Sequence, residues 1–404
     1  MTVATQCPYH TGADDRKSAA TAQLARAQVT IGGLSLSRQI LRGGCVRQGG
    51  FRAELLERFT PDAHAPVLFT EGEAHRRQRA ATARFFAPTV VVTRYRALIE
   101  RLSDGLVERF RIAGRARLDE LSLELAVGVA ADIIGLSESS VPAMSRRLGR
   151  FFSIRERNRN VLSSFASFLL AQTRVLAFYL CDVRPAIRAR RRERRDDLIS
   201  HLAEQGASHR EILIECLMYG AAGMVTTREF IVMAAWHLFE REDLRAHFLA
   251  VDHDERIAIL EEILRLEPVV GALYRRANRE LTLDVKGQTV RVPAGSLLAF
   301  DVRTTNADTD VVGEFPHCLN PQRSRRDTKT SASVMSFGDG PHRCPGAIVA
   351  LEEAAIFLGR LLSVPDIRLV QAPGIEWNPV VAGYELRGAV IVVGDAAQSS
   401  QQAT

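Results

Sequence analysis

The ten residues 337–346, FGDGPHRCPG, contain the side chain with the clearest chemical potential, the thiol of Cys344. Glycine and proline predict a tight turn here, and the cysteine directly precedes a predicted helix whose first position suits Pro345. The helix dipole and free backbone N–H groups favour a thiolate at that point, and His342 and Arg343 add positive charge. An anionic metal ligand needs such surroundings. The alternative is a buried structural cysteine, our interpretation of the other five, Cys7, Cys45, Cys181, Cys216 and Cys318.

A long apolar helix is predicted from about 208 to 241, and its middle is unusual. Ser208 and Glu211 form a capping box at its start, and the body is apolar on almost every side, so the helix should cross the interior. Gly220, Gly223 and the pair Thr226-Thr227 are weak helix formers at the centre, where propensity should be strongest. A threonine hydroxyl can compete for backbone carbonyls and open a helix locally. The small side chains at 220–227 leave a groove on this helix, which either accommodates a close crossing of another helix or receives a ligand.

The rest of the chain predicts a mainly α protein with small β-sheets. Residues 88–267 are mostly helical, and a helix at 253–267, which ends before Pro268, carries Glu262 and Arg265 three residues apart. Short strands follow at 269–300, with a turn at 293–295, then an irregular stretch at 301–336, a helix at about 345–362 and strands within 379–393. We expect one domain, 21–394, between flexible tails 1–20 and 395–404.

Composition excludes several classes of protein. The net charge is +6, and the 50 arginines (against three lysines) are spread along the chain instead of forming one stripe with aromatics, which argues against nucleic-acid binding. The dense run at 184–197 is interpreted as a solvated connection between helices. The cysteines lack the spacing of a disulfide scaffold or a zinc site, and the chain has neither a signal peptide nor an apolar stretch long enough for a membrane. We expect a cytoplasmic protein with no nucleic-acid or membrane partner.

The cysteine segment resembles the F-x-x-G-x-x-x-C-x-G loop of the cytochrome P450 family, with Phe337, Gly340, Cys344 and Gly346 at the matching positions. Further motifs are similar to the family's in the same order along the chain. They are H-x-x-x-R within 71–88, A-G-x-x-T-T at 222–227, E-x-x-R at 262–265, the segment 274–283, and TNAD at 305–308. Agreement at six ordered positions indicates a member of this family.

The resemblance implies haem b enclosed between the central helix and the helix after the cysteine loop. Cys344 would be the axial thiolate, a ligand that favours O–O cleavage. Phe337 would pack beside the haem, and the loop glycines Gly338, Gly340 and Gly346 would border it. The family places cationic partners of the haem propionates at four positions, which here are His75, Arg79, Arg275 and His342. Either Arg275 or Arg276 could point inward.

The resemblance also implies a structural ion pair. Glu262 and Arg265 would be joined by an arginine from the stretch before the cysteine loop, for which we select Arg323. Arg325 and Arg326 are nearby competitors for this position.

The central motif departs from the family pattern. Ala222, Gly223 and Thr226 match, but Val225 occupies the place of the acid that normally precedes the threonine and helps to deliver protons. Valine offers neither a pKa nor a hydrogen bond for this purpose. Two alternatives for proton supply are water held at Thr226 and a polar group of the substrate. A third is a different reaction, such as oxidative coupling, ring formation or use of a preformed oxidant. Drift at a tolerant position is the fourth explanation.

The same resemblance predicts the walls of a substrate pocket. They are Met224 and Val225 on the central helix, the five residues Val269, Val270, Gly271, Ala272 and Leu273, and the stretch 45–70. Helices at about 150–182 should cover the entrance, where Arg155, Arg157 and Arg159 are interpreted as solvated surface.

The expected function is a monomeric haem-thiolate monooxygenase that uses O2 and two electrons from a ferredoxin and its reductase. The substrate would be a small organic molecule, either free or held on a carrier protein, and secondary-metabolite tailoring is the expected role. One alternative is an atypical member that catalyses coupling or ring formation. Others are a non-catalytic binding or recruiting module and a haem-based sensor, for which no output domain is visible.

Overall fold

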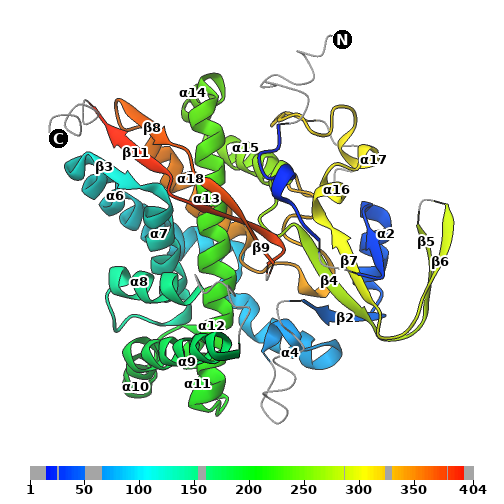
Figure 1. The fold of residues 1–404 in the computed structure, drawn as a ribbon. Helices are drawn as coiled ribbons and strands as arrows, with labels where there is room; N and C mark the ends of the chain where they lie inside the picture. Colours follow the sequence, from blue (N-terminus) through cyan, green and yellow to red (C-terminus); the bar gives the residue numbers. More distant parts are fainter. Residues whose placement is uncertain are drawn as a thin grey trace.

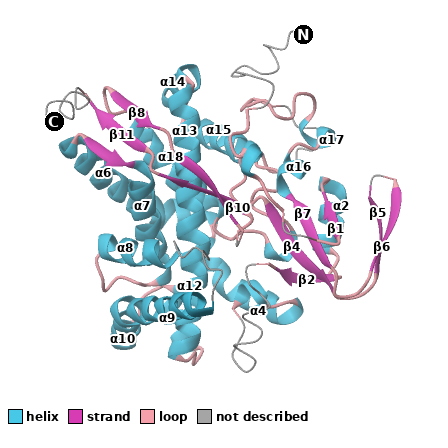
Figure 2. Cartoon of the chain, viewed as in Figure 1, coloured by secondary structure: helices cyan, strands magenta, loops and turns pink. Residues whose placement is uncertain are grey.

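A computed structural model describes residues 15–394 except 25–26, 51–65, 153–160, 286, 324–329 and 380. Helices form most of the molecule, and small sheets lie along its sides (Figures 1 and 2). The expected mainly α architecture is confirmed. The structure gives no description of residues 1–14 or of the predicted C-terminal tail 395–404.

The α-helices of the described residues are mostly two to five turns long. Their bounds are α2 Leu34–Arg42, α4 Gly72–Ala83, α5 Pro88–Val90, α6 Arg96–Ala113, α7 Leu118–Ile134, α8 Val141–Phe152, α9 Val161–Phe178, α10 Arg184–Arg192, α11 Leu198–Glu204, α12 His209–Gly220, α13 Thr226–Glu240, α14 Glu242–Ala250, α15 His253–Leu266, α16 Val302–Asn306, α17 Thr309–Val312 and α18 Ala347–Leu362.

Four small sheets accompany them. The largest has the order β1-β7-β4-β2, formed by Val29–Ile31, Leu297–Asp301, Ala272–Ala277 and Val46–Gly49. β1 runs parallel to β7, and the other pairs are antiparallel. The others are the hairpins β5–β6 (Leu281–Val285, Gln288–Val292) and β9–β10 (Gly374–Asn378, Gly383–Arg387) and the sheet β3-β11-β8 (Arg115–Arg117, Val390–Val393, Ile367–Gln371).

The central helix is one continuous rod that changes pitch in the middle. Helices α12 and α13 are joined without a break by the π-helical segment η6, Ala221–Val225. The predicted capping box is present: the Ser208 hydroxyl accepts from the Glu211 N–H, and the Glu211 carboxylate accepts from the Ser208 N–H. The rod passes through the middle of the molecule (Figure 1), and α13 packs against α7 and α18 in the largest hydrophobic core. A π-helical segment leaves backbone carbonyls without their ordinary helical partners, which is the local opening that the glycine and threonine residues predicted.

Several elements differ from the sequence predictions. Helix α18 begins at Ala347 with Gly346 as its N-cap, so Pro345 lies before the helix instead of at its first position. The stretch 301–336 contains two short helices, α16 and α17. Within 184–197, predicted to be a solvated connection, residues 184–192 form helix α10, and Arg190 is buried in an ion pair with Asp197.

The N-terminal segment is packed where the flexible tail 1–20 was expected to continue. Asp15 and Ser18 are buried, because Asp15 pairs with Arg241 and accepts from the Leu319 N–H, while the Ser18 backbone N–H donates to Glu267 over 3.2 Å. These contacts attach the start of the described chain to the ends of α13 and α15.

The cysteines differ in burial. Cys216 and Cys318 are buried, as predicted for structural cysteines, whereas Cys45 is half-buried and Cys181 is exposed, so the prediction of a buried cysteine is wrong for Cys181. Cys318 is disulfide-bonded, although the spacing of the cysteines did not indicate a disulfide scaffold. Among the described residues, no helix is long and apolar enough to cross a membrane.

Candidate functional site

Cys344 lies at the end of a loop that is folded back on itself in front of α18. The Cys344 backbone N–H donates to the Phe337 carbonyl over 2.8 Å, and the Gly338 N–H donates to Met335. Gly338 and Gly340 both have φ of +72°, the left-handed region that glycine adopts without strain. A Cβ on Gly340 would lie 2.7 Å from the Leu41 carbonyl oxygen, so glycine is also needed for the loop to approach α2.

The Cys344 thiol is surrounded by protein and yet has accessible surface. Burial is the largest influence and raises its pKa, while the Gly346 N–H and the charges of Arg79 and Arg343 act in the opposite direction. The side chain is nevertheless exposed, and a Cβ placed on Gly346 would meet nothing within 4 Å. We interpret this exposure as an opening inside the fold beside the sulfur. The sulfur lies near the positive charges of Arg79 and Arg343 and near the backbone donor of Gly346.

Four basic side chains converge next to this opening from three separate elements. His75 and Arg79 come from α4, Arg275 from β4 and His342 from the cysteine loop. The rings of His75 and His342 are 4.2 Å apart, and Arg79 donates a hydrogen bond to the Arg343 carbonyl. The sequence analysis selected these four residues, and the structure brings them together.

Arg275, and not its neighbour Arg276, is the inward-pointing arginine. Arg275 is only 5% exposed, and its guanidinium donates to the Tyr274 carbonyl, whereas Arg276 is half-buried and donates to the Gly295 carbonyl. Burial lowers the pKa of Arg275 to about 10, against the opposing effect of the Glu71 carboxylate. A desolvated guanidinium therefore lies next to the opening with incomplete compensation of its charge.

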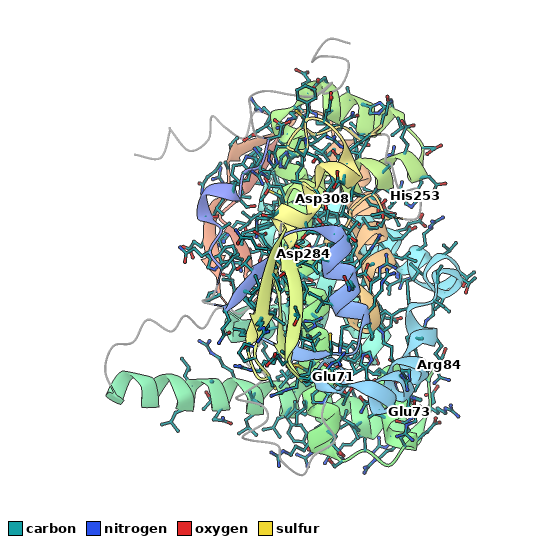
Figure 3. All side chains as sticks on the ribbon, turned by 90° about the vertical axis from the view of Figure 1, so that its right-hand side faces the viewer. Glu71, Glu73, Arg84, His253, Asp284 and Asp308 are labelled. Carbon is teal, nitrogen blue, oxygen red and sulfur yellow. The ribbon has the colours of Figure 1, made fainter. Side chains whose placement is uncertain are left out.

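Glu71 is a member of this cluster that sequence reasoning missed. It is the N-cap residue of α4 (labelled in Figure 3), and its carboxylate accepts from the Gln48 N–H over 2.6 Å and lies 3.1 Å from His342 Nε2. Burial tends to raise the pKa of Glu71, but its contact with His342 and the other donors give a net lowering. Burial, together with the charges of His342 and Arg79, lowers the pKa of His75 to about 4, so His75 is neutral at pH 7.

The central helix presents Ala222 and Thr226 at its π-helical segment. Ala222 is exposed although it lies within the rod that crosses the molecule, and the Thr226 hydroxyl donates to the Ala222 carbonyl over 2.5 Å. A Cβ on Gly223 would lie 4.0 Å from Ala130 of α7, an ordinary van der Waals distance, so the space between these helices does not by itself require glycine here. Met224 has no exposed surface and belongs to the core, which contradicts its prediction as a pocket wall; Val225 is 7% exposed.

Glu229 does not replace the missing acid. It is buried and turned toward β10, where it accepts from the Leu386 N–H over 2.7 Å and from Arg387 over 2.8 Å. Its carboxylate is thus committed to the packing of the β9–β10 hairpin against α13.

The second predicted wall runs from the end of α15 into β4. Val269, Gly271 and Ala272 are buried, and Val270 and Leu273 are half-buried. Leu273 approaches the cysteine loop, since its Cδ1 lies 3.7 Å from where a Cβ of Gly338 would be. Most of the stretch 45–70, together with Arg155, Arg157 and Arg159, lies outside the described residues.

The predicted ion pair is assembled beneath the site. Arg265 donates to both carboxylate oxygens of Glu262 (2.7 and 2.8 Å), and Arg323 Nε donates to Glu262 over 3.2 Å. Arg265 also donates to the Pro316 and Asn306 carbonyls, which fastens the irregular stretch to α15. The rival candidates Arg325 and Arg326 lie outside the described residues.

Comparisons with known proteins agree with this geometry. The family model described as Cytochrome P450 matches residues 257–369, which include the ion pair and the cysteine loop. The chain is 28% identical over 340 residues to Cytochrome P450 107B1 of Saccharopolyspora erythraea (81% of this chain, 76% of that protein). It is 29% identical over 348 residues to nocardicin C N-oxygenase of Nocardia uniformis (82% and 80%). In fold it is similar to P450BioI, solved in complex with a ligated acyl carrier protein, with a TM-score of 0.74 at 19% identity (93% and 94% covered).

A cysteine loop of this kind and a central helix with a π-helical segment, in this fold, are the features of a haem-thiolate protein. The chain belongs to the cytochrome P450 family and is an oxidoreductase of its monooxygenase class. The family's prosthetic group is haem b. The residues present fit that group: the exposed thiol of Cys344 would serve as the iron ligand, and the desolvated Arg275 beside it would be a partner for a propionate.

Proposed function

We propose that this enzyme oxidises a small organic substrate with O2 and two electrons that a ferredoxin delivers one at a time. The observation that carries the proposal is the exposed Cys344 thiol next to the cluster of His75, Arg79 and His342, in a fold whose central helix has an opened turn with Ala222 exposed. When bound, haem b would supply oxygen activation, with Cys344 as its thiolate ligand.

The surrounding residues have separable roles in this proposal. Arg275, Arg79 and the two histidines would hold the propionates and fix the ring orientation. The backbone donor of Gly346 and the charge of Arg79 would stabilise the thiolate form of Cys344. Ala222 provides a short side chain where the helix faces the opening.

Proton supply is the step that this chain must organise differently. Thr226 Oγ1 is an available acceptor for water, while its proton is engaged by the Ala222 carbonyl. Val225 is apolar, and Glu229 is turned away. Protons would therefore travel through water at Thr226 or come from a polar group of the substrate.

The same valine supports a second candidate function. A reaction such as oxidative coupling or ring formation places a different demand on proton delivery, so an apolar residue before Thr226 is compatible with it. We keep hydroxylation or a similar oxygen insertion first, because Thr226 and the opened turn are both retained. Retention of Cys344 and of this turn also argues against a non-catalytic binding module.

Electron delivery is proposed to occur at the face that carries the cysteine loop. Arg76 and Arg77 of α4 and Arg343 of the loop are exposed, and Arg79 connects α4 to the loop through the Arg343 carbonyl. Exposed arginines of this kind suit an acidic protein such as a ferredoxin.

A carrier-bound substrate is a further proposal, supported by the resemblance in fold to P450BioI. Tailoring of a secondary metabolite is supported by the resemblance to nocardicin C N-oxygenase.

A spectral titration tests the proposed function. The purified ferric protein is titrated with aromatic, peptide, terpenoid and polyketide compounds while its haem absorption is recorded. A shift toward high spin with one class is expected, because a bound substrate displaces the water at iron. Incubation of the compound that gives this shift with the enzyme, a ferredoxin, its reductase and NADPH should then yield an oxidised product. A normal haem spectrum without product from any spectrally active compound would contradict the proposal.

A further inference from the structure

Glu215 is a shielded carboxyl group on α12 that has no role in the site described above. Its Oε1 accepts from the Val67 N–H over 3.3 Å, where Val67 begins the short 3-10 helix η2, Val67–Phe69. Its Oε2 is covered and has no hydrogen-bond partner among the described residues. One of the two carboxyl oxygens therefore has no hydrogen-bond partner among the described residues.

The charge of this group is also uncompensated. Burial raises the pKa of Glu215 to about 7, and the one contact that opposes this effect is the Val67 N–H; no described cation acts on it. The neighbouring polar groups are Cys216 and Tyr219 of the same helix, both neutral at pH 7, since burial raises the pKa of the Cys216 thiol well above its ordinary value and that of Tyr219 to about 12. In a chain with 50 arginines, leaving a shielded acid without a cation is unusual.

Glu215 shares helical spacing with Met218 and with Ala222 of the site. Ile212, Cys216 and Gly220 are buried, the residues between them are half-buried, and Ala222 is exposed. Positions 215, 218 and 222 follow the spacing of one helical face. With a rise of about 1.5 Å per residue, Glu215 lies about 10 Å along the helix from Ala222.

The surroundings fix this position firmly. Tyr219, one turn further along, stacks on Phe86 with ring centroids 5.9 Å apart and an interplanar angle of 8°. Tyr219 also hydrogen-bonds to Thr82 at the end of α4. The acid is thus held by a helix that is packed against α4, the same element that carries His75 and Arg79.

We propose that Glu215 binds a basic nitrogen of the substrate, so that the preferred substrates are amines whose nitrogen is remote from the position that is oxidised. This inference rests on the proposed function, because it assigns the substrate class of the same internal site. A protonated amine supplies both things that Glu215 lacks, a positive charge and an N–H donor. The terminal carboxyl torsion of glutamate is soft, so a small rotation can present the unused oxygen to the ligand.

A neutral substrate would gain less from this group. A hydroxyl donor provides a hydrogen bond without the charge, and a hydrocarbon provides neither, so both would leave the desolvated carboxyl uncompensated. Hydrogen bonds to a charged partner contribute more than neutral ones, and a preference of about tenfold for the amine over an alcohol of similar size is expected.

The test uses the haem-loaded enzyme and a matched pair of probes, N,N-dimethyl-4-phenylbutylamine and 4-phenylbutan-1-ol. Binding is measured by calorimetry and by the haem spectrum. The dissociation constant of the amine should be about tenfold below that of the alcohol, and Glu215→Gln should abolish this preference, because glutamine keeps the shape and the acceptor but loses the charge. Glu215→Asp should retain part of it. The control is Glu204→Gln on α11, which removes an exposed acid that pairs with Arg194 and should keep the full preference.

Every other result overturns the inference. Equal binding of both probes to the unmodified enzyme, absence of amine binding, or an undiminished preference in Glu215→Gln would each exclude Glu215 as the anchor. A red-shifted haem band would place the nitrogen at iron and exclude it as well. A normal thiolate spectrum in the same sample separates these results from failure of the proposed function, which would remove that spectrum altogether.

Discussion

The hydroxyl group of Thr226 donates to the backbone carbonyl of Ala222, four residues earlier, over 2.5 Å. This hydrogen bond lies at the π-helical segment of the central helix, where the Ala222 side chain is exposed inside the fold. Because its proton is engaged by the backbone, the threonine oxygen is left as a hydrogen-bond acceptor. The residue before it, Val225, contributes neither a proton nor a hydrogen bond, so the chain's own side chains give this turn one polar group.

Introducing an acid at the valine tests the argument about proton supply. Val225→Asp should increase product formation by about tenfold relative to Val225→Asn, since asparagine has similar size and hydrogen bonding but no titratable proton. Product and hydrogen peroxide are measured per NADPH consumed in the ferredoxin-coupled reaction. Equal rates and equal product patterns in both variants would show that position 225 carries no information about the mechanism.

The inward arginine should control haem retention. Arg275→Met removes a desolvated cation beside the internal opening and should weaken haem binding by about tenfold, measured as haem per chain after gel filtration and as the rate of haem transfer to apomyoglobin. Arg276→Met is the matched control, because Arg276 is the adjacent residue and donates to the Gly295 carbonyl at the other side of the strand. Equal haem loss from the two variants would contradict the assignment of Arg275.

The ion pair of Glu262 with Arg265 and Arg323 should contribute to the free energy of unfolding and should not affect the haem absorption spectrum. Glu262→Gln leaves Arg265 and Arg323 buried without their carboxylate, and breaking such a buried pair costs about 3 kcal/mol of unfolding free energy. Urea unfolding measures this loss, while Glu108→Gln, which breaks an exposed pair with Arg111, should leave the midpoint unchanged. An unchanged midpoint in Glu262→Gln would argue against a structural role of the network.

The shielded acid predicts how stability depends on pH. Glu215 has a pKa of about 7 in the folded chain instead of its ordinary 4.5, because burial disfavours the charged form. Between these two pH values the folded chain keeps a proton on Glu215 that the unfolded chain has released, so the stability that protonated Glu215 contributes is complete below about pH 4.5 and is lost as the pH rises through about 7. Glu215→Gln should remove a decline on the order of 2 kcal/mol, visible as a flatter profile of thermal midpoint against pH. Parallel profiles for the two proteins would exclude the raised pKa.

Local signals in the sequence predicted much of the fold and of the site. The capping box at Ser208 and Glu211, the turn around Cys344 and the weak helix formers at 220–227 each depend on neighbouring residues, and each predicted the local structure that is found. The basic cluster was selected through resemblance, and the structure brings its four members together.

Other features depend on tertiary packing, which no local pattern encodes. In the sequence, Glu71 is an ordinary acid before a predicted helix. In the structure, Gln48 of β2 and His342 of the cysteine loop place hydrogen-bonding groups next to its carboxylate. Met224 was predicted to face the substrate, but the π-helical segment rotates it into the core and exposes Ala222 instead. Glu215 gives no sequence signal at all, because its isolation results from the approach of Val67 and from the absence of any cation among its described neighbours.

The carbon monoxide difference spectrum of the reduced protein tests the central claim most directly. The unmodified protein should give the long-wavelength band of thiolate-ligated haem, and Cys344→Ser should lose that band, while Cys216→Ser, which changes a buried cysteine on the same central helix as Thr226, should keep it. A long-wavelength band that persists in Cys344→Ser, or its absence from the haem-loaded unmodified protein, would contradict the assignment of Cys344 as the axial ligand.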